Sequence, residues 1–558
     1  MTKILLASPA IKTGVPLFSQ LFPMPLGLAS LGGFLRQNGF TDIETKDFLV
    51  PNTRKLLSPP PSFKKKRTLF YQYGMSDEEI ETWCSDNLSR FDVIGVSSMQ
   101  INTAEDGVCQ LIRTMTEFSD APIIVGGYSA TTNPQWILDK SGADFLIRGE
   151  GELPFLELLR KMENGDLPNS GVFNNKFVQI ENLDDLPYPA WDLFPLELYP
   201  KYKNLQRIVL TTSRGCPFDC RFCSVKLIMG NDQCEPTAPK WRRHSSEYTV
   251  KLVKHLYEKF DARYLCILDD NFLADIPRAT EILEGIEKLK LKKARFYIEE
   301  GIMVRQAFRN PELIYKLTHL KFDNIALGVE SLTKTTLNYI KKPSTRTEIV
   351  SVTKKLKESN VEPKIFYILG FKTDTIDSML DNIMELATYK LEIRINNLHI
   401  LPNTEIWNEY VEEGLVDPEK WDFRLSSFYT PPTKNFCFAD IMELRKILRG
   451  VNYGIENDVD VFHDSFSEIK RKLGTVGLIM EHELSVAPKT MYARALSPIK
   501  SFLTILALRK GFSLISIKAN GNRLVASDSG RKTSTVENKL RDKFVGVKPT
   551  LLTFFGAT

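Results

Sequence analysis

The sequence has few cysteines and histidines for its length and no long apolar run. Its 558 residues include 8 cysteines and 6 histidines, and the formal net charge at pH 7 is +4. No stretch approaches the roughly 18 apolar residues of a membrane-spanning helix, and the apolar run before Pro9 is too short for a signal peptide. So few cysteines argue against a secreted disulfide framework, and so small a charge argues against a nucleic-acid partner. We therefore expect a cytoplasmic protein with no membrane span.

The composition is otherwise that of a soluble globular protein. Hydrophobic residues make up 43% of the chain and charged residues 25%, which are ordinary values. The length predicts about three or four domains, each able to bury a core of its own.

Three of the cysteines lie on one short loop. Cys216, Cys220 and Cys223 follow a C-x3-C-x2-C spacing, and the apolar run 207–212 before them predicts a strand that ends at the loop. Thiolates at this spacing bind an iron–sulfur cluster or zinc. Three ligands would leave one iron of a [4Fe-4S] cluster open, whereas a structural zinc site takes four. A zinc site completed by Cys234 or His244 is the alternative.

With the preceding Thr-Ser-Arg-Gly, this loop resembles that of the radical S-adenosylmethionine (SAM) superfamily. The resemblance implies a [4Fe-4S] cluster on the three cysteines, with SAM chelating the open iron. Reductive cleavage of SAM would then give a 5'-deoxyadenosyl radical that abstracts hydrogen. Phe222, at the aromatic position of the motif, would lie near the adenine.

Strands and helices alternate through residues 1–160, which predicts a doubly wound parallel sheet. Small residues cluster where the predicted strands end, and backbone amides can approach a bulky ligand closely there. The expected strands are 4–7, 43–45, 93–97, 123–125 and 145–147, and the expected helices are 26–38 and 103–118.

Four further segments resemble the cobalamin-binding radical SAM enzymes: 25–31, 123–127, 148–152 and 186–191. The resemblance covers roughly residues 1–430. It implies that cobalamin contacts Ser97, Ser98, Gly126, Gly127, Gly149, Glu150 and Gly151. All six histidines lie after residue 200, so no histidine of this domain can be the lower ligand of cobalt.

Residues 205–430 alternate strands and longer helices, as in a partial (β/α)6 barrel. The expected strands are 207–212, 264–268, 295–299, 324–329, 364–369 and 396–401. Polar residues follow most of these strands, at the end where barrel enzymes carry their chemistry. The resemblance and the charges of SAM assign Asp269 and Asp270 to its amino group, Arg305 to its carboxylate, Glu330 to the ribose or substrate region, and Gly370 and Leu401 to the adenine. Residues 241–244 either pair with cofactor groups or cap and solvate the next helix.

The remaining segments are predicted from composition. Residues 51–72, with prolines at 59–61 and a basic run at 64–67, predict a solvated loop, with a docking patch or an active-site flap as alternatives. Residues 458–463 read as a turn rather than a metal site, and 518–548 as a mobile segment. Helices are expected at 438–453, 464–473 and 489–510. The predicted domains are 1–180 for cobalamin, 181–204 as linker, 205–430 as barrel, and 431–558 as a mainly helical region that covers the barrel mouth and selects substrate.

Two cofactors in one chain favour a cobalamin-dependent radical SAM C-methyltransferase that acts on an unactivated carbon. By the resemblance, methylcobalamin supplies the methyl group and a second SAM restores it. The alternative within the superfamily is a cobalamin-assisted cyclase or ring-rearranging oxidoreductase. Other classes are a cobalamin or metal sensor and a zinc-stabilised structural protein. The expected partners are a small-molecule or protein side-chain substrate and a low-potential electron donor such as flavodoxin or ferredoxin.

Overall fold

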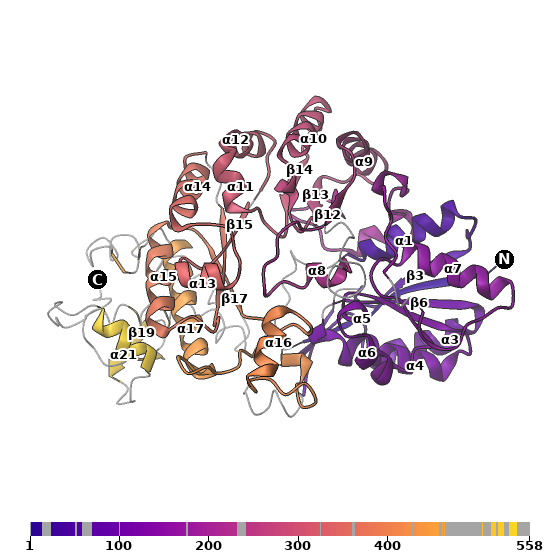
Figure 1. Cartoon of the computed structure of the whole chain (residues 1–558), viewed down its shortest axis with the longest axis horizontal. Helices are drawn as coiled ribbons and strands as arrows, with labels where there is room; N and C mark the ends of the chain where they lie inside the picture. Colours follow the sequence, from indigo (N-terminus) through magenta and orange to yellow (C-terminus); the bar gives the residue numbers. More distant parts are fainter. Residues whose placement is uncertain are drawn as a thin grey trace. The chain divides into compact units, whose positions relative to one another are not determined.

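The computed structural model divides into two compact units (Figure 1). One unit comprises residues 1–325 with 399–429, and the other comprises 326–398 with 430–558. The described residues are 2–13, 24–50, 53–58, 70–99, 101–173, 177–230, 241–323, 325–359, 363–425, 429–456, 460, 462–463, 501, 505, 515–520, 523–528 and 535–543.

A six-stranded parallel sheet forms the N-terminal part of the first unit. Its order is β3-β1-β6-β7-β8-β9, so the chain reverses its direction of sheet growth between β1 and β6, where this fold binds its ligands. Helices α1 and α7 contact each other on one face, and α3, α4 and α6 cover the other (Figure 1). The elements are β1 Ile4–Ser8, β3 Ile43–Asp47, β6 Val93–Ser98, β7 Ile123–Gly127, β8 Phe145–Leu146, β9 Gly171–Val172, α1 Leu26–Gln37, α3 Asp77–Asn87, α4 Gln110–Phe118, α6 Pro134–Ser141 and α7 Glu152–Glu163.

The five strands and the first helix predicted for residues 1–160 are all present, within two residues at each end. The predicted helix 103–118 begins instead with two irregular turns, η3 Ile101–Thr103 and η4 Glu105–Cys109, before α4. Residues Ile4, Leu5 and Leu6 are fully buried, because helices cover both faces of the central strand.

A small antiparallel sheet was not predicted. It has the order β2-β5-β4, with β2 Ile11–Thr13, β5 Phe70–Tyr73 and β4 Arg54–Leu57. The loop predicted for residues 51–72 is therefore wrong where β4 and the start of β5 lie. The basic, exposed β4 sits at the edge of the sheet, where charged side chains are ordinary. The prolines at 59–61 and the basic run at 64–67 lie outside the described residues.

Each unit contains a three-stranded parallel sheet whose strands follow one another in chain order. The first unit holds β10 Arg207–Leu210, β13 Tyr264–Ile267 and β14 Arg295–Ile298, with α9 Ser246–Lys259 and α10 Ile276–Lys288 packed together beside them. The second holds β15 Ala326–Glu330, β16 Lys364–Leu369 and β17 Ile393–Asn397. Five of the six predicted strands match, but the last was predicted three residues too late.

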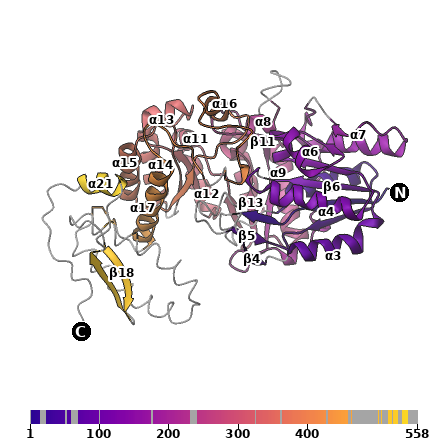
Figure 2. The same cartoon turned by 90° about the horizontal axis from the view of Figure 1, so that it is seen from below.

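Two helices of the second unit, α17 Phe438–Glu456 and α15 Ile376–Thr388, pack against each other, and α21 Thr535–Asp542 contacts both. The helix predicted at 438–453 is confirmed. A hairpin of β18 Ile515–Asn520 and β19 Arg523–Asp528 is an additional element (Figure 2). The predicted helix 464–473 lies outside the described residues, and of 489–510 only residues 501 and 505 are described. Among the described helices, none is long and apolar enough to cross a membrane.

Candidate functional site

The cysteine loop follows β10 and is framed by a two-stranded hairpin. Strand β11, Ser213–Gly215, pairs with β12, Trp241–Arg243, and the short helix α8, Val225–Ile228, begins after the third cysteine. Gly215 has φ +85°, a backbone conformation that favours glycine and turns the chain into the loop.

The three thiols suit a metal cluster. All three cysteines are partly exposed. Burial, with the nearby Cys220 and Cys216, raises the pKa of Cys223 to about 12, so a strongly cationic centre is needed to hold the set as thiolates. In the part of the chain that is described, no three His, Cys, Asp or Glu side chains surround one ion position. Cluster thiolates bind different irons, so this spacing is compatible with a cluster.

His244, one candidate for a fourth zinc ligand, is engaged elsewhere. Its Nδ1 lies 3.3 Å from an oxygen of Asp184, and its ring stacks on Tyr248 at 4.0 Å between centroids. Burial lowers the pKa of His244 to about 4, so the ring is neutral near pH 7. The other candidate, Cys234, lies outside the described residues.

Asp269, predicted to bind the SAM amino group, instead braces the strand that leads to the cysteines. Its oxygens accept from Thr212 N at 2.6 Å, Thr212 Oγ1 at 2.6 Å, Ser213 N at 3.2 Å and Ser213 Oγ at 2.7 Å. The side chain is fully buried. This carboxylate is saturated by protein donors, and we correct its assignment to a structural one.

Asp270 and Glu300, at the ends of β13 and β14, form a pair of carboxyl groups open to solvent. Although their atoms are exposed, surrounding protein desolvates them. Desolvation and the charge of Asp269 raise the pKa of Asp270 to about 6, and desolvation with Glu299 and Asp270 raises that of Glu300 to about 7. Such a pair would be stabilised by a bound cation. The sequence predicted that both residues follow strands, but it predicted no role for Glu300.

The other predicted SAM contacts are divided between the two units. Phe222, Arg305 and Leu401 belong to the first unit, where Arg305 lies in α11, Val304–Arg309. Glu330 and Gly370 belong to the second. Glu330 ends β15 with φ +61° and pairs with Lys342 at 3.1 Å. Gly370 has φ +96°, and a Cβ there would lie 2.8 Å from Thr430 Cγ2, so local packing already requires this glycine.

A cavity of about 300 Å³ opens at the carboxyl ends of β6, β7 and β8. Six of the seven residues predicted to contact cobalamin line it: Ser97, Gly126, Gly127, Gly149, Glu150 and Gly151. Ser98 is buried beside them, and its Oγ has no hydrogen-bond partner among the described residues. Gly127 has φ +100°, and a Cβ there would lie 2.5 Å from Ser98 O. Glycines along this largely apolar wall let backbone groups approach a large cofactor closely.

The two glutamates of the turn at 149–152 pair with arginines of the cysteine-loop hairpin. Arg214 lies 3.1 Å from Glu150 and 2.6 Å from Glu152, and Arg242 bonds Glu150. Glu150 also accepts from Ile180 N at 3.0 Å. Burial alone would raise the pKa of Glu150, but Arg214 and Arg242 hold it below its usual value.

These pairs correct two sequence predictions. Glu150 lines the cavity, but its carboxylate is occupied by protein donors, so we no longer assign that carboxylate to cobalamin. The segment 241–244 was expected either to bind cofactor groups or to cap a helix. Instead, Arg242 pairs with Glu150, and the exposed Arg243 pairs with Asp275 at 3.2 Å.

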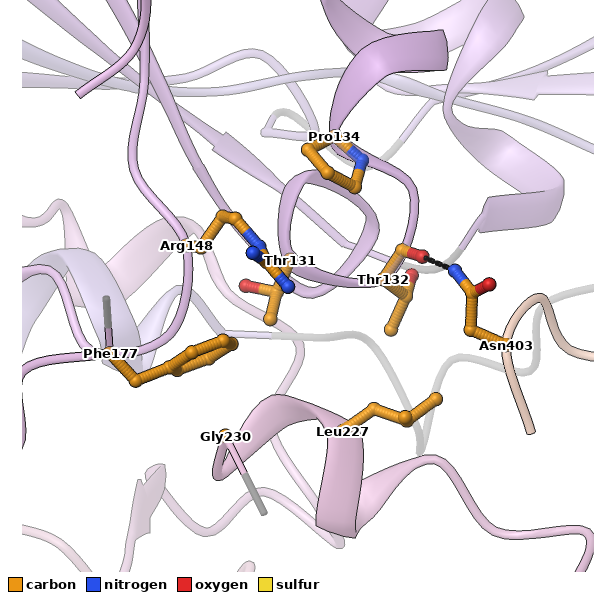
Figure 3. Close-up of a pocket in the computed structure, with 8 residues that line it drawn as sticks. All are labelled: Thr131, Thr132, Pro134, Arg148, Phe177, Leu227, Gly230 and Asn403. Carbon is orange, nitrogen blue, oxygen red and sulfur yellow. Dashed lines mark hydrogen bonds between the residues drawn. The ribbon is translucent and has the colours of Figure 1, made fainter. Parts of the chain in front are cut away.

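A second cavity, of about 180 Å³, lies beside α8 (Figure 3). Asn403 Nδ2 donates to Thr132 O at 2.7 Å on one side, and the Arg148 guanidinium lies 4.9 Å from the centre of the Phe177 ring on the other. No sequence signal pointed to this cavity, because its lining comes from short segments far apart in the chain: Thr131, Thr132, Pro134, Arg148, Phe177, Leu227, Gly230 and Asn403.

Two family models match the chain. Residues 210–387 match the radical SAM superfamily, and residues 20–159 match the B12 binding domain. These ranges contain the cysteine loop and the glycine-lined cavity, respectively. The chain therefore belongs to the cobalamin-binding radical SAM enzymes, whose cofactors are a [4Fe-4S] cluster, SAM and cobalamin.

Individual relatives share modest identity. An uncharacterized methyltransferase of Pyrococcus horikoshii is 26% identical over 54% of this chain and 65% of its own length, so the chain spans less than two thirds of that relative. The anaerobic magnesium-protoporphyrin IX monomethyl ester cyclase of Synechocystis is 22% identical over 78% of this chain and 83% of its own.

Two solved structures share the fold. The cobalamin-dependent radical enzyme OxsB has a TM-score of 0.59 at 16% identity, covering 92% of this chain and 73% of its own. The methyltransferase TsrM of Kitasatospora setae, solved with cobalamin and a [4Fe-4S] cluster bound, has a TM-score of 0.54 at 14% identity, covering 74% of this chain and 78% of its own. The fold is thus the predicted α/β one, with a doubly wound cobalamin-binding sheet followed by a partial (β/α)6 radical SAM barrel.

Proposed function

We propose that this protein is a cobalamin-dependent radical SAM methyltransferase that methylates an unactivated carbon. The observation that carries the proposal is that the cysteine loop and the glycine-lined cavity lie in one compact unit and are joined by the glutamate–arginine pairs. A radical made at the cluster and a methyl group held by cobalamin would then act on one substrate. The methyltransferases among the relatives and solved structures support this reading.

The protein's own residues would hold these groups in place. Cys216, Cys220 and Cys223 would bind the cluster. Asp270 and Glu300 would face the cationic amino group of SAM, and the strand ends at Ser97, Gly126 and Gly149 would contact cobalamin. When bound, the cluster with SAM supplies hydrogen abstraction and cobalamin supplies the methyl group. Phe222, Arg305, Glu330, Gly370 and Leu401 remain proposed SAM contacts, and the domain limits given above remain proposals.

Several partners and properties belong to the same proposal. The cluster requires a low-potential electron donor such as flavodoxin or ferredoxin. The substrate is a small molecule or a protein side chain, and the region 431–558 covers the barrel mouth and selects it. The enzyme works in the cytoplasm.

A cyclase is the second candidate. The cyclase of Synechocystis aligns over more of this chain than the Pyrococcus methyltransferase does. Cyclisation would use the same cofactors but transfer no methyl group, so the SAM products of the two reactions differ.

The test is anaerobic reconstitution with iron, sulfide and hydroxocobalamin, followed by chromatography of SAM products under a low-potential reductant. A methyltransferase releases both 5'-deoxyadenosine and S-adenosylhomocysteine, and a cyclase releases the first alone. Cys216→Ala/Cys220→Ala/Cys223→Ala should make no 5'-deoxyadenosine, whereas Cys437→Ala, at an exposed cysteine, should behave as wild type. A zinc-loaded protein that forms neither product would refute the proposal.

A further inference from the structure

Four charged side chains, three of them buried, join the wall of the glycine-lined cavity to the hairpin that frames the cysteine loop. Glu150 and Glu152 come from the turn after β8 and the start of α7, whereas Arg214 and Arg242 come from β11 and β12. The side chains of Glu150, Glu152 and Arg242 are 6–7% exposed, and that of Arg214 is 19% exposed. Arg214 bridges both glutamates, and the two acids and two bases leave no net charge.

A hydrogen bond holds the other end of the same loop. Tyr128, the residue after Gly127 at the cavity wall, shares a hydrogen bond with Ser224, the residue after Cys223. Arg214 stands two residues before Cys216 at the start of the loop. The cysteine loop is thus held at both ends by residues that adjoin the cavity.

Stability alone is a poor reason for a buried ionic network. Removing charges from water costs about as much as their mutual attraction returns, so apolar residues of similar size often stabilise a fold as well. What such a network supplies is geometry, because an arginine bonded to two carboxylates has one orientation. Here that geometry relates the cysteine loop to the cavity.

We propose that Glu150, Glu152, Arg214 and Arg242, with Tyr128 and Ser224, are positioning residues that set the placement of the cluster relative to cobalamin. The inference rests on the proposed function for the identity of the two ligands. By reciprocity, a change on the cluster side alters cobalamin affinity, and a change on the cavity side alters the environment of the cluster.

The test measures each site after a change at the other. In reconstituted protein, Arg214→Gln should weaken hydroxocobalamin binding by about tenfold or more, a loss of about 1.4 kcal/mol. Glu152→Gln should shift the electron paramagnetic resonance spectrum of the reduced cluster with SAM bound. The charge swap Glu152→Arg/Arg214→Glu should recover part of both losses. Asp192→Asn, which breaks the 2.6 Å pair with Arg36 away from the cavity lining, should change neither readout.

Tyr128→Phe removes a single oxygen and provides the decisive variant if a charge variant does not fold. It should also shift the cluster spectrum. Wild-type cobalamin affinity and wild-type spectra in all folded variants would overturn the inference and leave a merely structural network. Failure of the proposed function would be seen differently, as wild-type protein that does not bind hydroxocobalamin.

Discussion

At the scale of single residues, two neighbouring aspartates have different environments. Asp269 turns into the fold and is saturated by the backbone and hydroxyl groups of Thr212 and Ser213. Asp270 is exposed at the end of β13. Both residues follow β13, which ends at Ile267, and there one carboxylate braces the strand before the cysteine loop while the next lies at the surface.

Substitution should separate these roles. Asp269→Asn should destabilise the protein by about 2 kcal/mol, because a charged acceptor of several hydrogen bonds is lost. Asp270→Asn should leave the unfolding midpoint nearly unchanged and weaken SAM binding by about tenfold or more. Denaturant unfolding and equilibrium binding of SAM to reconstituted protein measure the two effects. Equal SAM affinity in wild type and Asp270→Asn would remove Asp270 from the proposed site.

His244 should make stability depend on pH. The ordinary pKa of 6.5 falls to about 4 in the folded state, so between these values the unfolded chain binds a proton that the folded chain does not. The contribution of His244 is therefore complete above pH 6.5 and is lost as the pH falls, by about 2 kcal/mol at pH 5. Wild type should lose this amount relative to His244→Gln between pH 7.5 and pH 5 in denaturant titrations. His319→Gln, at an exposed position, is the control, and parallel pH profiles for wild type and His244→Gln would contradict the prediction.

At the scale of elements, helix α17 covers the open edge of the second three-stranded sheet. Asn452 of α17 accepts from Ile393 N at 3.0 Å and donates to Ile393 O at 2.8 Å, which satisfies the edge strand β17 as a neighbouring strand would. Arg445 donates to Asn397 at 2.8 Å near the other end of β17. An uncovered edge would leave backbone groups free to pair with another chain.

Asn452→Ala should therefore destabilise the protein by about 1–3 kcal/mol, because a backbone donor and acceptor lose their partner. Lys446→Ala, on the exposed side of the same helix and paired with Glu443, should cost less than about 0.5 kcal/mol. Denaturant midpoints compare the two variants. An equal loss in both would mean that the edge contact contributes nothing of its own.

The register between β16 and β17 explains why the sixth strand was predicted three residues too late. The strand predicted at 396–401 includes Leu398 and Ile400, which are both buried. The ladder with β16 runs instead from Ile393 to Asn397. Burial is read from residue type, but pairing depends on the register of the neighbouring strand, which the local pattern does not contain.

At the scale of the whole molecule, the candidate cobalamin cavity and the cysteine loop belong to one compact unit, and β15, β16 and β17 belong to the other. A ligand that binds only the folded state stabilises the part that holds it. Cobalamin should therefore protect the first unit in preference to the second.

Hydroxocobalamin at about 100 times its dissociation constant should add about 2.7 kcal/mol to the stability of the first unit. Hydrogen exchange followed by mass spectrometry should show slower exchange in residues 93–98, 123–132 and 145–152 and little change in 364–369 and 393–397. Protection spread evenly over both units, or absent from the first, would contradict this placement of the cofactor.

Local patterns in the sequence determined the cluster motif, the parallel sheets and the small residues at their ends. A motif of three cysteines is recognised by its spacing, and strands and helices are recognised by the different periods of their apolar residues. The motif and the elements can therefore be predicted without knowledge of tertiary contacts. The same patterns placed Ser97, Gly126 and Gly149 together, because the carboxyl ends of parallel strands share one edge of a sheet.

Tertiary structure alone decided which charges meet. Arg242 and Glu150 are 92 residues apart in the chain, and Arg214 and Glu152 are 62 apart, so no local pattern relates them. Asp269, Glu150 and Glu300 look alike in the sequence, as acidic residues after a strand. Their different environments arise because a carboxylate takes the nearest donors that folding brings to it, and where it finds none it remains available to a ligand.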